Sequence, residues 1–263
     1  MDNQGQLLVI GIGPGHRGGM TLDGMEALAA SEVVIGYGPY LKQLGSLLQG
    51  KELMARGMRQ ELERCAEAIR LAKEGKVVAL VSSGDAGIYG MAGPLWEMLL
   101  ASGWREGDAP LVRVIPGVSA VSACSALVGA PLTHDFCTIS LSDLLTPWDV
   151  ICMRLEAAAR ADFVTALYNP RSRRRTQQLV DARLIFLQHR DPQTPVAIIR
   201  DGWRADQWVQ LTDLVTFDVE RVDMNTTLII GNSRTFVQEG RMVTPRGYAD
   251  KYGPLQQALE DEG

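Results

Sequence analysis

Cysteine is scarce in this chain of 263 residues, and its spacing excludes the usual cysteine-based sites. The four cysteines, at positions 65, 124, 137 and 152, form neither a C-x-x-C pair nor a set paired with histidines. This spacing gives no support to a zinc or iron–sulfur site, and a chain long enough to bury a core does not need a disulfide framework. We therefore expect no metal site and interpret all four cysteines as small buried hydrophobic residues.

Long apolar runs and an excess of positive charge are also missing. No stretch of about 18 apolar residues occurs, and the polar start MDNQGQ lacks the basic and apolar segments of a secretion signal. The formal net charge of −5 argues against broad affinity for nucleic acids or anionic membranes, because such affinity needs a positive surface. We expect a cytoplasmic protein with no nucleic-acid or membrane partner, in which any anionic ligand meets a local basic cluster.

Short apolar runs alternate with helical patterns in the first part of the chain. The spacing of apolar residues over 59–74 predicts one buried helix stripe, and Gly75 is well placed to end that helix. The runs that predict parallel strands are LLVIG at 7–11, VVIG at 33–36, VVALVS at 77–82 and VRVIPG at 112–117. Residues 1–116 are therefore predicted to form a doubly wound α/β domain.

A second set of strands is predicted over residues 117–248. Its runs are CTISLS at 137–142, FVTALYN at 163–169, VAIIRDG at 196–202, WVQL at 208–211 and TTLIIGN at 226–232. The last three lie too close together for long helices between them, which indicates antiparallel pairing and a mixed sheet. The predicted fold class is thus α/β, with two α/β domains joined near Pro116 and Gly117, a mostly parallel first sheet, a mixed second sheet and a charged tail over 249–263.

The first glycine-rich motif, Gly11-Ile12-Gly13-Pro14-Gly15, directly follows the first predicted strand. Open α/β sheets bind ligands at this position, and glycine lets the backbone approach them closely. A dinucleotide fingerprint needs glycine where His16 stands and an acidic residue where Gly36-Tyr37-Gly38 stands, so a nicotinamide oxidoreductase is disfavoured. A plain tight turn and a loop for another ligand both stay open.

Two more glycine-containing loops follow the third and fourth strands of the first domain. In Ser83–Gly90, Asp85 offers a carboxylate and Tyr89 a flat phenol, although Asp85 could alternatively cap the next helix. The other loop is Pro116–Ala120. Because the carboxyl ends of parallel strands meet at one edge of a sheet, the three loops together predict one ligand pocket.

The second domain carries two further polar groups. The segment Tyr168–Arg175 (YNPRSRRR) concentrates four arginines after a strand, and arginine suits carboxylates in particular, although a solvated charged face is the alternative. His134 and Asp135 precede another strand, where histidine could relay a proton or have a purely structural role.

Together these loops resemble a known family. GIGPGHRGGMT, SSGDAGIYG, PGVSAVSA and YNPRSRRR, in this order, are similar to the motifs of the tetrapyrrole (class III) methyltransferases over nearly the whole chain. The longer blocks GAPLTHDFCTISLSDLLTPW, DFVTALYNPRSRRR and MVTPRGY resemble the precorrin-3B C(17)-methyltransferases and their cobalt-factor III counterparts. Ala86 stands where the family has proline, and His16-Arg17 stands where an acidic residue is frequent.

The resemblance implies a two-domain homodimer that holds S-adenosylmethionine, its methyl donor, in an active-site cleft between the domains. It implies a transferase of cobalamin and porphyrin biosynthesis that methylates carbon 17 of precorrin-3B or cobalt-factor III and contracts the ring, with another carbon of a precorrin-type tetrapyrrole as the alternative. The implied cofactor-binding positions are Pro14, Gly84, Asp85, Tyr89, Ser119, Ala120, Asn169, Gly202 and Thr227.

For the substrate and the chemistry we rely on loop position and charge. We expect Tyr37 and Tyr40 to line the substrate trough and Arg171, Arg173 and Arg174 to bind peripheral carboxylates. His134 or Asp135 is the candidate catalytic residue for ring contraction. A non-catalytic tetrapyrrole carrier is the alternative outside the enzymes, but it would have no use for three convergent glycine loops.

Overall fold

The computed structural model describes residues 4–57, 60–253 and 255. The chain divides into two compact units, Met1–Ala123 and Cys124–Gly263, and the division falls inside helix α5 (Ala120–Val128). The domain limits expected at residue 116 and the cleft expected between the domains stay predictions. Among the described residues, no helix has both the length and the apolar character that a membrane span requires. Most of the tail after residue 253 lies outside the described residues.

The first unit is built on a five-stranded sheet whose strands are all parallel, in the order β3-β2-β4-β1-β5. Its strands are β1 (Gln6–Gly11), β2 (Val33–Tyr37), β3 (Glu52–Arg56), β4 (Val77–Ser82) and β5 (Leu111–Ile115). The mostly parallel sheet predicted from the sequence is confirmed. The prediction missed β3, because this edge strand leaves most of its side chains exposed and so lacks an apolar run.

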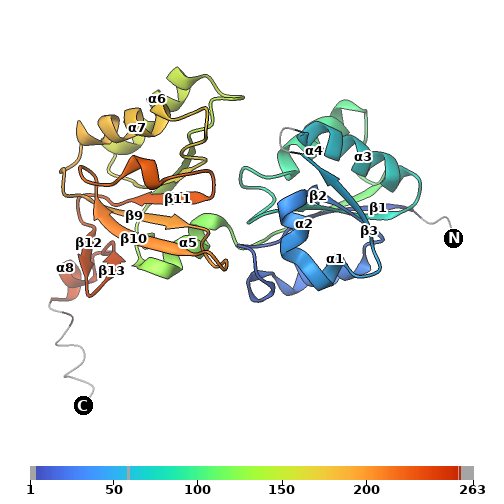
Figure 1. Cartoon of the computed structure of the whole chain (residues 1–263), viewed down its shortest axis with the longest axis horizontal. Coiled ribbons are helices and arrows are strands. Elements are labelled where there is room, and N and C mark those ends of the chain that lie inside the picture. Colours follow the sequence, from blue (N-terminus) through green and yellow to red (C-terminus); the bar gives the residue numbers. More distant parts are fainter. Residues whose placement is uncertain (1–3, 58–59, 254, 256–263) are drawn as a thin grey trace, which may run out of the picture. The chain divides into compact units, whose positions relative to one another are not determined.

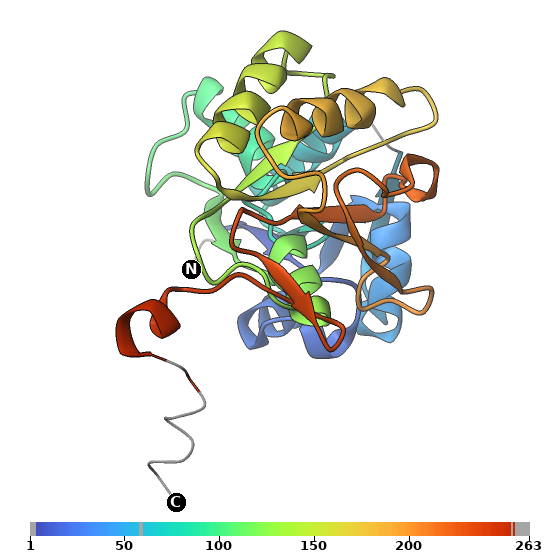
Figure 2. The same ribbon diagram turned by 90° about the vertical axis from the view of Figure 1, so that its left-hand side faces the viewer.

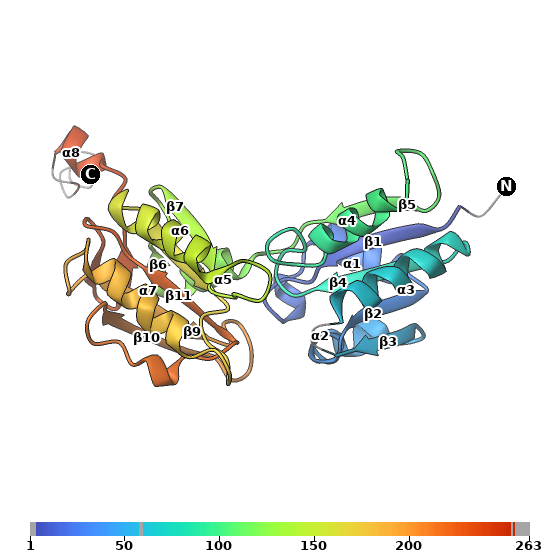
Figure 3. The same ribbon diagram turned by 90° about the horizontal axis from the view of Figure 1, so that it is seen from above.

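Helices cover both faces of this sheet. Strand residues such as Leu8 and Ile10 pack against α1 (Leu22–Ala30) and α2 (Gly38–Leu44) on one face. Their neighbours Leu7 and Val9 point to the other face and pack against the second pair of helices. That pair is α3 (Glu61–Lys73) and α4 (Ala92–Ala101), which lie side by side along the sheet (Figures 1 and 3). Gly75 follows α3 with a φ of +92°, as the sequence predicted.

The second unit contains a mixed five-stranded sheet in the order β10-β9-β11-β8-β7. Its strands are β7 (Phe136–Ser140), β8 (Val164–Tyr168), β9 (Pro195–Arg200), β10 (Trp208–Asp213) and β11 (Thr226–Ile230). β7 runs parallel to β8, whereas β9 pairs antiparallel with both β10 and β11, so the predicted mixed sheet is confirmed. One edge of the sheet therefore collects the carboxyl ends of β7, β8 and β9 together with the amino ends of β10 and β11.

The second sheet buries its main core on one face. There, α6 (Trp148–Arg160) and α7 (Gln177–Leu187) lie side by side, in yellow-green and gold in Figure 2. The large buried side chains of this core include Leu155, Phe186 and Phe217. A small sheet of β12 (Phe236–Gln238), β13 (Arg241–Val243) and β6 (Gly129–Ala130), followed by α8 (Tyr248–Tyr252), completes the unit.

Candidate functional site

The three glycine loops of the first unit leave the same edge of its sheet. They follow β1, β4 and β5, which are neighbours in the order β4-β1-β5. The helices after β1 and β4 pack on opposite faces of the sheet. Adjacent strands whose connections diverge in this way mark the place where open α/β sheets bind ligands.

The loops touch through their backbones. Gly13 and Gly84 exchange two hydrogen bonds, with N···O distances of 3.0 and 2.8 Å. A Cβ atom added to Gly11 would lie 2.7 Å from both the Gly84 carbonyl oxygen and the Gly117 nitrogen, and one added to Gly117 would collide with the carbonyls of Gly84 and Gly11. Glycine is therefore required at these positions because no side chain fits between the loops. The convergence that the sequence predicted is present.

Asp85 joins two of these loops. One of its carboxylate oxygens accepts a hydrogen bond from the Gly87 nitrogen at 2.8 Å, and the other accepts one from the Gly117 nitrogen at 2.9 Å. The alternative reading, in which Asp85 caps the next helix, is wrong, because α4 has Met91 at its N-cap position. A carboxylate can accept further hydrogen bonds, so Asp85 keeps capacity for a ligand while it holds the loops in register.

The other predicted cofactor positions of the first unit lie on the same loops. Pro14 is buried within the first loop. Tyr89 is half-exposed and has a φ of +52°, although it is not glycine. Ser119 is buried with its hydroxyl 3.0 Å from that of Ser122, and Ala120 is the first residue of α5.

In the second unit, Asn169, Gly202 and Thr227 share the edge where β8 and β9 end and β11 begins. The Asn169 amide donates a hydrogen bond to the Ser140 hydroxyl at 3.0 Å. Gly202 packs so closely that an added Cβ would lie 3.1 Å from the sulfur of Cys124, whose thiol is also hydrogen-bonded to the Thr227 side chain. The structure thus brings these three predicted positions together at one edge.

Left-handed backbone conformations concentrate on these loops. Six described non-glycine residues have positive φ, and four of them lie there: Tyr89, Asn169, Asp201 and Trp203. Such conformations cost about 1 kcal/mol or more each and cluster at functional sites. Asp201 and Trp203 flank Gly202, and the sequence analysis missed both. Their distinguishing feature is a positive φ angle, which the folded chain imposes and the residue type does not predict.

Two of the four cysteines are less buried than the sequence predicts. Cys65 and Cys124 are buried, as expected, but Cys137 and Cys152 are only half-buried. Cys152 lies on α6, where part of the helix surface faces solvent. Burial raises the pKa of Cys65 and of Cys124 to about 11, and it also raises the pKa of Cys137 and Cys152. None of these thiols is activated as a nucleophile.

The structure separates the arginines of the segment 171–175 into different roles. Arg171 pairs with Glu220 at 2.5 Å. Arg175 is mostly buried, donates to the Leu141 carbonyl at 2.7 Å, and has a pKa lowered by burial. Arg173 and Arg174 are exposed, and neither has an ion-pair partner within residues 4–57, 60–253 and 255. These two cations are therefore available to an anionic ligand.

His134 and Asp135 lie at the opposite edge of the second sheet from Asn169. They precede β7, and Asp135 accepts a hydrogen bond from Val164 at the start of β8. Strands of five residues separate this edge from the other by roughly 15 Å. Both residues are exposed and line a separate pocket of about 360 Å³. This placement gives their catalytic role no support, and the role stays a prediction.

Tyr37 ends β2 at the ligand edge of the first sheet, and Tyr40 lies in the first turn of α2. Their rings are in edge-to-face contact, with centroids 5.2 Å apart.

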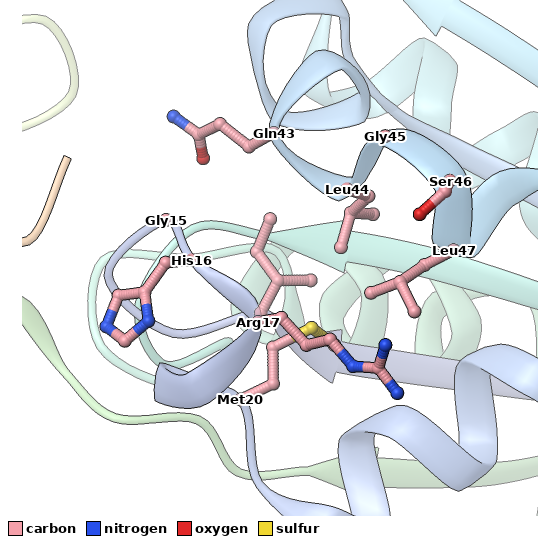
Figure 4. Close-up of a pocket in the computed structure, with 10 residues that line it drawn as sticks. Gly15, His16, Arg17, Met20, Gln43, Leu44, Gly45, Ser46 and Leu47 are labelled. Atoms are coloured by element: carbon pink, nitrogen blue, oxygen red, sulfur yellow. The ribbon is translucent and has the colours of Figure 1, made fainter. Parts of the chain in front are cut away.

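A pocket of about 220 Å³ lies nearby, between Gly15, His16 and Arg17 of the first loop and Gln43, Gly45 and Ser46 after β2 (Figure 4). In Figure 4 the side chains of His16 and Arg17 extend in different directions from this loop. The departure from the family pattern at these two positions thus places basic side chains beside the loop.

Comparison with known proteins places the chain among methyltransferases. Residues 6–217 match the family model of the Tetrapyrrole (Corrin/Porphyrin) Methylases. A probable cobalt-factor III C(17)-methyltransferase of Salmonella typhimurium is 49% identical over 92% of this chain and 99% of its own length. The cobalt-factor III methyltransferase of Priestia megaterium is 47% identical over 95% of this chain, which spans only 46% of that longer protein. The crystal structure of the methyltransferase CobJ superimposes with a TM-score of 0.86 at 36% identity, covering 92% of this chain and all of CobJ.

The glycine contact predicts the effect of one added methyl group. We expect Gly117→Ala to lower the melting temperature, because the new Cβ forces three backbone segments apart at a cost of about 1–3 kcal/mol. Thermal unfolding followed by circular dichroism measures this effect. Gly93→Ala is the matched control, since nothing lies within 4 Å of its added Cβ in α4, and it should melt at or slightly above the wild-type temperature because alanine favours the helix. Equal melting temperatures for the two variants would contradict the close approach.

The buried thiols predict a pH dependence of stability. The folded-state pKa of Cys124, about 11, exceeds that of an unfolded cysteine, so deprotonation favours unfolding. We expect this stabilisation to be complete below about pH 8.5 and to be lost as the pH rises towards 11, by at most about 3 kcal/mol. Denaturant titrations of wild type and Cys124→Ala measure the difference, and Cys152→Ala, which removes a thiol that is only half-buried, should change the pH dependence less. If the free energy of unfolding of Cys124→Ala falls with pH between 9 and 11 as steeply as that of wild type, the raised pKa of Cys124 is refuted.

Proposed function

The chain belongs to the tetrapyrrole (corrin/porphyrin) methylases, and from that premise we propose that it methylates carbon 17 of cobalt-factor III or precorrin-3B. The methyl donor is S-adenosylmethionine, the ring contracts in the same reaction, and the product continues towards cobalamin. The observation that carries the proposal is the meeting of three glycine loops at one sheet edge, within a chain that matches this family over most of its length.

The chemistry of these loops fits S-adenosylmethionine better than a dinucleotide. A dinucleotide pyrophosphate is held by backbone N–H groups, and Pro14 removes one such donor from the first loop. Residues 83–90 and 116–120 contain no lysine or arginine. They offer instead a carboxylate, a buried hydroxyl and backbone groups that glycine leaves accessible. A carboxylate suits an ammonium group, and neutral donors and acceptors suit a ribose and an adenine.

We propose that the cofactor is held by the positions that the family resemblance implies. These are Pro14, Gly84, Asp85, Tyr89, Ser119, Ala120, Asn169, Gly202 and Thr227. When bound, the cofactor supplies an electrophilic methyl group on a sulfonium. The chain's own contribution is to orient the two reactants, because the conjugated ring is already nucleophilic and holding it at near-attack distance removes much of the barrier.

The substrate side of the proposal depends on charge. A precorrin-type ring carries acetate and propionate groups, and the exposed Arg173 and Arg174 are free to bind them. Arg171 can join them only if a substrate carboxylate replaces Glu220. Tyr37 and Tyr40 present aromatic surface to the ring. The overall acidic chain thus concentrates positive charge where an anionic substrate needs it.

Ring contraction needs a proton to move, and His134 or Asp135 is our sequence-based candidate for that step. The position of these residues at the far edge of the second sheet gives a clear test. If turnover of His134→Ala equals that of wild type, His134 has no part in the reaction. Two further parts of the proposal are a homodimer, which depends on the family resemblance, and a cytoplasmic location, which depends on the composition. Sedimentation equilibrium measures the first.

The decisive experiment is anaerobic incubation of the protein with cobalt-factor III or precorrin-3B and methyl-labelled S-adenosylmethionine. Mass spectrometry and NMR then assign the labelled carbon. Label at carbon 17 of a contracted ring is the expected result. Label at another ring carbon would support the alternative within the family, and the absence of methyl transfer to either substrate would refute the proposal.

The exposed arginines generate a second prediction. We expect Arg173→Ala/Arg174→Ala to raise KM for the tetrapyrrole about tenfold or more, because two charge-assisted carboxylate contacts are lost, while the affinity for S-adenosylhomocysteine stays unchanged. Steady-state kinetics and calorimetry measure the two effects. The control Arg154→Ala/Arg160→Ala removes the same charge from exposed positions on α6. An equal rise of KM in both double variants would mean that net charge alone is responsible.

A further inference from the structure

The loop between β7 and α6 exposes two neighbouring leucines at its tip. Leu144 is 60% exposed and Leu145 is 94% exposed, the highest value among the large hydrophobic side chains of the described residues. Single exposed leucines are common on protein surfaces, but two in succession at a loop tip leave a continuous apolar surface in water. Such a surface indicates contact with a partner or a ligand.

The base of this loop is fixed rather than loose. Leu141 is fully buried, its nitrogen donates to the Tyr168 carbonyl at 2.9 Å, and its carbonyl accepts from Arg175 at 2.7 Å. Asp143 accepts a hydrogen bond from the Gln178 amide at 2.7 Å and lies 3.8 Å from Arg175. The two leucines are therefore presented from a rigid base, which lowers the entropy cost of binding something against them.

These same contacts place the leucines beside the substrate-binding arginines. Arg175 joins the loop to the segment that carries Arg173 and Arg174, and both segments leave the ligand edge of the second sheet, next to Asn169. The tip therefore combines an apolar surface with two neighbouring cations that have no ion-pair partner in the described part of the chain. A tetrapyrrole has the complementary pattern, because its macrocycle has a broad apolar face and carboxylates around the rim.

We propose that Leu144 and Leu145 pack against the face of the tetrapyrrole and are positioning residues for the substrate. This inference rests on the proposed function, and it adds a specificity element that the glycine loops and the arginines do not supply. Arginines alone would bind any polycarboxylate, whereas apolar contact with the ring face selects a flat macrocycle. The substrate is thus the partner that covers the exposed leucines, and they are exposed in the free protein because no substrate is bound there.

The test compares wild type with Leu144→Ser/Leu145→Ser. We expect the dissociation constant for cobalt-factor III, measured by quenching of tryptophan fluorescence, to rise about tenfold to a hundredfold, because the apolar contact is lost. S-adenosylhomocysteine affinity by calorimetry and the melting temperature should stay the same, because the changed side chains contribute to neither the cofactor loops nor the core. In turnover assays KM should rise more than kcat falls.

Two matched variants sharpen the test. Leu184→Ser changes another exposed leucine, on α7, and should bind the ring like wild type. Leu145→Met keeps an apolar side chain and should retain most of the affinity.

Three results would overturn the inference. If wild type and the double serine variant bind cobalt-factor III equally, the leucines do not contact the ring. If the variant loses ring affinity only together with a change of oligomeric state in light scattering, the tip contacts a second copy of the chain instead. If wild type binds S-adenosylhomocysteine but neither cobalt-factor III nor precorrin-3B, the proposed function itself fails, and the inference fails with it.

Discussion

The candidate site depends on the close approach of three backbone turns at the edge of the first sheet. Gly11, Gly84 and Gly117 lie so near one another that a methyl group added to Gly11 or Gly117 would force them apart. Asp85 then fixes the spacing by accepting hydrogen bonds from two of the turns. Side chains are excluded from this point of contact, so the surface that the turns present is made of backbone groups and a few polar side chains. Such a surface suits a small polar cofactor and leaves the larger anionic substrate to other residues.

Those other residues are organised by charge and exposure. In a chain of net charge −5, the arginines of residues 171–175 divide between those with structural contacts and those that stay exposed. Arg175 donates a hydrogen bond that holds the β7–α6 loop, whereas Arg173 and Arg174 stay exposed. The loop that Arg175 holds also carries the two exposed leucines, Leu144 and Leu145. They are thereby presented beside Arg173 and Arg174. One edge of the second unit thus carries an exposed apolar surface next to exposed cations, the two features that the proposed substrate needs.

Much of the fold was predictable because buried strands carry unbroken apolar runs. Strands such as β4 and β11 were located from their apolar runs alone. The close spacing of the last three predicted strands identified the mixed sheet. Edge strand β3 was missed because exposure removes the apolar signal. Within the candidate site, the glycine loops were identified because glycine recurs after three parallel strands, whose carboxyl ends meet at one sheet edge. Asp201 and Trp203 were missed because a left-handed φ leaves no mark in those residue types.

The sequence by itself determined the fold class, the glycine loops and the family, since all three are written in local patterns of residue type. Only the tertiary structure decided which polar groups serve which purpose. Asp85 could have capped a helix but instead joins two loops, and His134 lies at the opposite sheet edge from Asn169 despite its suitable chemistry. The reason is that a side chain's role depends on partners distant in the chain. Pairing of strands fixes those partners, and residue type alone does not.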